Sequence, residues 1–73
     1  MADHFMLKDH NHDLVQQLSE ISDSVWRIEE YLKASAECEA CRALWERLRA
    51  DYEAHVVLLR DEIAKHARED RFD

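Results

Sequence analysis

Six aliphatic residues in the first half of the chain recur at alternating intervals of four and three positions. They are Leu14, Leu18, Ile21, Val25, Ile28 and Leu32. Because an α-helix places residues three and four positions apart on the same face, this heptad spacing predicts one long helix with a continuous apolar seam. Extending the spacing backwards reaches Asn11 and Leu7, and either Asn11 or Asp9 could cap the start of the helix.

The composition narrows the fold class further. The 73 residues include no glycine and no proline, so tight β-turns and phosphate-binding loops lack the residues that they normally need. With 47% hydrophobic and 37% charged residues, the chain is typical neither of disordered proteins nor of membrane-spanning ones. The sequence therefore predicts an all-α protein.

The second half of the chain carries a less regular seam, which can be read in two registers. One register runs through Cys41, Trp45, Leu48, Tyr52, His55, Leu59, Glu62 and His66, and the other through Leu44, Leu48, Asp51, His55, Leu58 and Glu62. Leu48, His55 and Glu62 belong to both registers. These three residues are therefore predicted to lie on the buried face of a second helix.

A break in the pattern at residues 33–37 predicts a turn, because Ser35 can cap the start of a new helix. The expected architecture is an antiparallel hairpin with helices at about 9–33 and 37–68 and a turn at about 34–36. One continuous helix is the alternative, since the residues of the break tolerate a helix. Closing the hairpin near Ser35 would place Leu14 opposite His55, and residues 10–13 opposite residues 58–62.

A hairpin of this size would bury roughly 60% of its unfolded surface, which is marginal for independent stability. Four large aromatic residues widen the apolar surface beyond the area that one helix pair can cover: Trp26, Tyr31, Trp45 and Tyr52. We therefore expect a homodimer that forms a four-helix bundle, and the same surface could also bind a helix of a partner protein.

The charge balance excludes two classes of partner. A formal net charge of −7 repels nucleic-acid phosphates and anionic lipid surfaces, so neither nucleic acid nor membrane is an expected partner. The first ten residues have an acid at position 3 and no long apolar run, so they do not resemble a secretory signal. The predicted compartment is the cytoplasm.

Histidines and a glutamate are predicted to converge at the open end of the hairpin. The candidate metal ligands are His10, His12, His55, Glu62 and His66. Imidazole and carboxylate side chains that project inward from helices can bind iron or zinc, because helical spacing aims them at a shared point. The alternative is that His55 is a hydrogen-bonded core residue, while His10, His12 and His66 are solvated.

Two segments carry a resemblance to a known family. Residues 7–18 resemble the first helix of hemerythrin-like domains, in which an acid–histidine pair precedes leucines, and residues 45–55 resemble their second helix. The resemblance implies a four-helix iron-binding bundle, here assembled from two copies, with His10 or His12 as the first-helix ligand and His55 as the second. The chain departs from the family where Leu59 occupies the position of an iron-bridging glutamate, and Glu62 has no family counterpart.

Cys38 and Cys41 form a CxxC motif at the predicted start of the second helix, where the helix dipole stabilises thiolates. The alternative is structural, with Cys41 packed near the turn and Cys38 half-exposed. No nucleophile–base pair or phosphate-binding loop can be assigned. The sequence thus predicts a non-enzymatic interaction or regulatory module that acts as a homodimer, with a small hemerythrin-like metal-binding bundle as the alternative.

Overall fold

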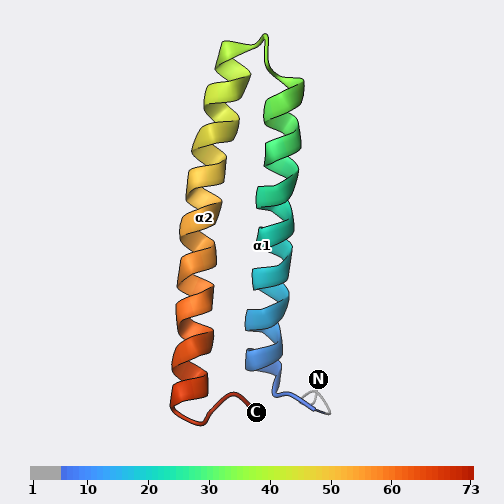
Figure 1. Ribbon diagram of the computed structural model, residues 1–73. Helices are drawn as coiled ribbons and strands as arrows, with labels where there is room; N and C mark the ends of the chain where they lie inside the picture. The colour runs from blue at the N-terminus through green and yellow to red at the C-terminus, as the bar shows by residue number, and fades with distance from the viewer. Residues whose placement is uncertain (1–5) are drawn as a thin grey trace.

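The computed structural model describes residues 6–73, which form two long antiparallel helices and contain no strand. Helix α1 spans Asp9–Ala34 and helix α2 spans Glu39–Arg68 (Figure 1). The predicted all-α hairpin is thus confirmed, and the molecule is elongated, with extents of 48 × 23 × 15 Å. Residues 1–5, which belong to the segment tested above for a secretory signal, lie outside the described residues.

The heptad seam of α1 faces α2 along its whole length, as predicted. Ile21 and Ile28 are buried, with 8% and 3% of their surface exposed. The other four seam residues are half-buried: Leu14, Leu18, Val25 and Leu32. Only these two aliphatic side chains in the described chain are buried, which is a small core for two helices of this length.

The seam of α2 follows the first predicted register only in part. Trp45, Leu48 and Tyr52 are half-buried, but the next inward residue is Val56, and His55 is exposed. The prediction that His55 lies on the buried face is therefore wrong. An α-helix has 3.6 residues per turn, so a seam whose intervals alternate strictly between four and three residues rotates gradually around the helix. Two successive intervals of four residues, from Leu48 to Tyr52 and from Tyr52 to Val56, keep the seam in contact with α1.

The second predicted register of α2 is wrong. It would bury Leu44 and Leu58, which are 53% and 68% exposed, and Asp51, which is exposed as well. Beyond Val56 the inward positions are occupied by Leu59, by the half-buried Glu62 and Ile63, and finally by His66. The apolar part of the seam therefore ends about one turn before α2 does.

The turn lies later in the chain than predicted, and Ser35 has a different role there. Ser35 is the C-cap of α1, and its hydroxyl donates hydrogen bonds to the main-chain oxygens of Tyr31 at 2.9 Å and Leu32 at 3.3 Å. The N-cap of α2 is Cys38, three residues further on. At the start of α1 the N-cap is Lys8, so neither Asp9 nor Asn11 caps that helix.

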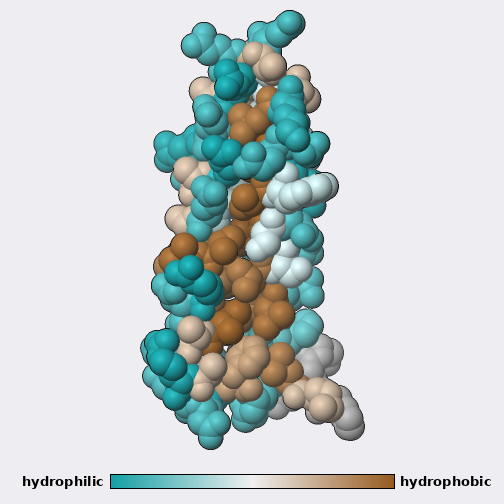
Figure 2. Space-filling view, viewed as in Figure 1, coloured by the Kyte–Doolittle hydropathy of each residue, from teal (hydrophilic) through white to brown (hydrophobic). Residues whose placement is uncertain are grey.

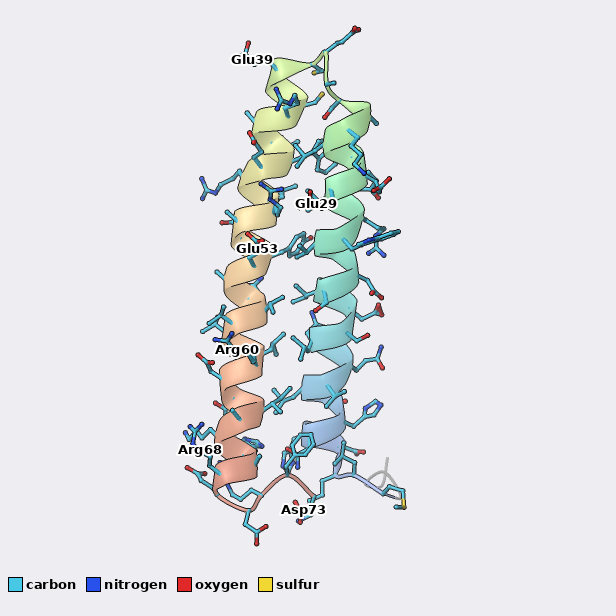
Figure 3. All side chains as sticks on the ribbon, in the orientation of Figure 1. Glu29, Glu39, Glu53, Arg60, Arg68 and Asp73 are labelled. Atoms are coloured by element: carbon cyan, nitrogen blue, oxygen red, sulfur yellow. The ribbon has the colours of Figure 1, made fainter. Side chains whose placement is uncertain are left out.

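The later turn changes which residues face each other across the hairpin. The rings of Tyr31 and Trp45 lie 4.9 Å apart near the turn, and Asn11 faces His66 at the open end. The predicted pairing of residues 10–13 with residues 58–62 is therefore wrong by about one to two helical turns. The inward-pointing side chains of both helices are visible in Figure 3, where the labelled Arg60 and Arg68 point away from α1.

Candidate functional site at the open end of the hairpin

The open end is built by the first turn of α1, the last turn of α2 and the segment that follows α2. Residues 69–73 turn back beneath the hairpin and bring Asp73 beside the start of α1 (Figures 1 and 3). Asp70 makes this reversal possible by adopting the left-handed conformation, with φ of 56°. The N–H of Asp70 donates to the oxygen of Ala67, and that of Arg71 donates to the oxygen of His66. This pattern is a Schellman motif, which ends a helix and satisfies its last carbonyl groups.

The returning segment is bound to α1 through main-chain oxygens. The N–H of Lys8 donates to the main-chain oxygen of Asp73 at 2.7 Å. The Asn11 side-chain amide donates to the main-chain oxygens of Arg71 at 2.9 Å and Asp73 at 3.1 Å. Lys8 also forms an exposed ion pair with the carboxylate of Asp73. Asn11 is 0% exposed, so its side chain links the start of α1 to the segment after α2 in the interior of the protein.

A chain of hydrogen bonds continues from Asn11 into α2. Asn11 Oδ1 lies 2.7 Å from His66 Nδ1, and His66 Nε2 lies 2.9 Å from Glu62 Oε2. His66 is only 7% exposed, whereas the side chain of Glu62 is 45% exposed and reaches solvent. The network therefore runs from the buried amide to the protein surface within one turn of α2.

The partners of Asn11 determine where the hydrogen atoms of this network lie. Both N–H groups of the amide face carbonyl oxygens, which can only accept, so the amide oxygen must face His66. His66 Nδ1 therefore carries a hydrogen and donates it to Asn11. Because Glu62 presents a carboxylate oxygen to Nε2, a proton must also lie between these two atoms.

Three of the five predicted metal ligands gather at this site. Glu62 and His66 are hydrogen-bonded, and the ring of His10 lies edge-on to the ring of His66 with centroids 5.7 Å apart. His12 instead contacts the carboxylate of Asp13 at 3.3 Å. His55 lies eleven positions before His66 on the exposed surface of α2, with its ring 6.3 Å from that of Tyr52.

The geometry offers no observation in favour of a metal ion at this end. Within residues 6–73, no group of three or more His, Cys, Asp or Glu side chains is arranged to hold one. Both ring nitrogens of His66 already have hydrogen-bond partners. Asn11, which organises the site, was not among the predicted ligands. The sequence feature that could have indicated Asn11 is its position on the backward extension of the heptad seam. A polar side chain on such a buried face needs hydrogen-bond partners inside the protein.

The two thiols form a second cluster, at the opposite end of the hairpin. Cys38 is half-buried and its sulfur accepts a hydrogen bond from the N–H of Cys41 at 3.2 Å, while Cys41 is exposed. Hydrogen bonds from the thiol and the N–H of Cys41 lower the pKa of Cys38 below its ordinary value. The same thiol–thiol hydrogen bond raises the pKa of Cys41. The predicted packing of Cys41 near the turn is therefore wrong, whereas Cys38 is half-exposed as predicted.

None of the known protein families, curated proteins or solved structures matches this chain. The resemblance to hemerythrin-like domains therefore stays a prediction. No helix within residues 6–73 is long and apolar enough to cross a membrane.

Proposed function

We propose that this protein is a non-enzymatic helical interaction module that acts as a homodimer, in which two hairpins pack into a four-helix bundle. The observation that carries the proposal is the incomplete core, because only Ile21 and Ile28 among the described aliphatic residues are buried. A pair of long helices with so little buried apolar surface gains stability when another helix pair covers its seam.

An open apolar groove supplies a surface for that contact. It has a volume of about 340 Å³ and lies between the helices, lined by Ser22, Val25, Glu53, Val56 and Val57. Apolar side chains remain visible along the boundary of the two helices in the space-filling view (Figure 2). The groove therefore lies where helices of a second hairpin would pack in a bundle.

Exposed apolar residues lie both in the groove and beside it. Val57 is 42% exposed, and Trp26, one turn after Ser22 on α1, is 67% exposed. Large aromatic residues are favoured at interfaces because they bury much area at a small entropic cost. A second copy is the occupant to which we commit, since a two-fold dimer covers this same surface on both chains at once.

Association can be tested with two neighbouring substitutions on α2. Val57→Glu places a carboxylate at the groove, and Leu58→Glu places one at an adjacent residue that does not line it. Both residues are exposed, so neither change removes a buried contact from the single hairpin. We expect Val57→Glu to weaken the dimer at least about tenfold, which corresponds to about 1.4 kcal/mol, and Leu58→Glu to leave it unchanged.

Sedimentation equilibrium over a range of micromolar concentrations measures the effect, with circular dichroism as a control for helix content. A parent protein that is monomeric throughout, yet stably helical, would exclude the homodimer. A dimer that is weakened equally by both substitutions would exclude this groove as its interface.

A further inference from the structure

The turn of the hairpin brings two thiols together at the end of the molecule that the proposed dimer surface does not use. Cys38 is the N-cap of α2 and Cys41 lies in its first turn. The Cys38 sulfur accepts a hydrogen bond from the N–H of Cys41 at 3.2 Å. Two cysteines three positions apart, with the sulfur of one hydrogen-bonded to the N–H of the other, can close into a disulfide by movement of their side chains.

We propose that Cys38 and Cys41 form a redox-active dithiol that reduces organic disulfides by thiol–disulfide exchange and closes into an intramolecular disulfide. This activity is independent of the proposed dimerisation, because it needs only residues of the turn and of the first turn of α2.

Cys38 is the attacking residue in this proposal. Its sulfur sits at the N-terminus of a 30-residue helix and accepts hydrogen bonds, an arrangement that stabilises negative charge. The charged side chains nearest in the sequence are Glu37 and Glu39, which oppose a thiolate, and Arg42, which favours one. The lowered pKa of Cys38 shows that the hydrogen bonds outweigh burial, which alone would raise it.

Cys41 is suited to the second step of the exchange. It is exposed, so a mixed disulfide on Cys38 would still leave its sulfur able to reach the Cys38 sulfur. Its own pKa is raised, so it remains a thiol while Cys38 reacts. Neither cysteine belongs to the buried pair Ile21 and Ile28, so closing the disulfide leaves the core undisturbed.

The exchange balances in atoms and electrons. The Cys38 thiolate attacks one sulfur of the organic disulfide, forms a mixed disulfide and releases the other sulfur as a thiolate. Cys41 then loses its proton to solvent and attacks the Cys38 sulfur, which releases the second thiolate. The two cysteines are oxidised by two electrons, and the organic disulfide is reduced to two thiols.

The test uses the reduced full-length protein, oxidised glutathione as the disulfide, and mass spectrometry of acid-quenched samples. We expect the parent protein to lose two hydrogen atoms per chain without forming a disulfide between chains. Cys41→Ser should retain one glutathione on Cys38, and in Cys38→Ser the remaining Cys41 should react about tenfold more slowly than Cys38 does.

A matched control moves the second thiol by one residue, through Cys41→Ala combined with Ala40→Cys. Position 40 is exposed like position 41, but a thiol at position 40 is not carried by the residue whose N–H binds the Cys38 sulfur. We expect its internal disulfide to form about tenfold more slowly, with an unchanged circular dichroism spectrum. The proposal is overturned if the parent protein accumulates two glutathiones or a disulfide-linked dimer. It is also overturned if Cys41 reacts as fast as Cys38, or if the control closes as fast as the parent.

Discussion

Replacing Asn11 by alanine would test whether the buried network stabilises the hairpin. The substitution removes three hydrogen bonds of a side chain that is 0% exposed. Two of these bonds end on main-chain oxygens of Arg71 and Asp73, which are exposed residues, so water can replace the lost donor. The third leaves His66 Nδ1–H without an acceptor at a position that is only 7% exposed.

The expected loss in the free energy of unfolding follows from these differences in exposure. Each bond that water can replace contributes about 0.5–1.5 kcal/mol, whereas a buried donor without a partner costs about 1–3 kcal/mol. We therefore expect Asn11→Ala to lower the free energy of unfolding by about 2–6 kcal/mol. For a chain of this length that loss corresponds to a decrease in Tm of about 10–50 °C.

Thermal unfolding followed by circular dichroism is the assay, with every variant at the same protein concentration because dimerisation would shift Tm. Gln17→Ala is the matched control, since Gln17 lies on the exposed surface of the same helix. Asn11→Asp keeps an acceptor opposite His66 but turns a carboxylate oxygen toward the main-chain oxygens of Arg71 and Asp73, so its Tm should be no higher than that of Asn11→Ala. Equal Tm values for Asn11→Ala and Gln17→Ala would refute the stabilising role of the network.

Two further predictions concern the core and the metal. Ile21→Asp should lower the free energy of unfolding by more than about 3 kcal/mol, because it forces an unpaired charge into the middle of the seam, and circular dichroism together with sedimentation should show helix content and association lost together. Protein purified without a histidine tag should contain no stoichiometric iron or zinc by elemental analysis. A bound metal that His55→Ala abolishes would contradict the placement of His55 away from the other histidines.

The first helix could be predicted from the sequence because every step of its seam carries an aliphatic residue. Six such residues in one unbroken series leave a single face for burial, and the structure buries that face. In α2 the inward positions include Arg49, Tyr52 and His66, which are also common on exposed faces. Periodicity alone could not place Val56 inward and His55 outward, since only contact with α1 decides between neighbouring positions.

The details of the turn and of the open end could not be predicted from the sequence, because they depend on contacts that local sequence preferences do not indicate. Ser35 is equally suited to either end of a helix, and its actual partners are carbonyl groups of α1. Cysteine is not a usual N-cap residue, so Cys38 gave no signal of its role. The positive φ of Asp70 reverses the chain after α2, and only this reversal brings Arg71 and Asp73 to Asn11.

The attachment of residues 69–73 to α1 also affects how the hairpin opens. Isolated helices fray independently at their ends, because terminal turns have few partners. Here the first turn of α1 and the last turn of α2 share hydrogen bonds between residues 55 to 62 positions apart in the chain. Loss of any one of these bonds exposes the others to water, so the two helix ends must open as one cooperative unit. The polar network thus gives the open end of the hairpin the linkage that the covalent chain provides at the turn.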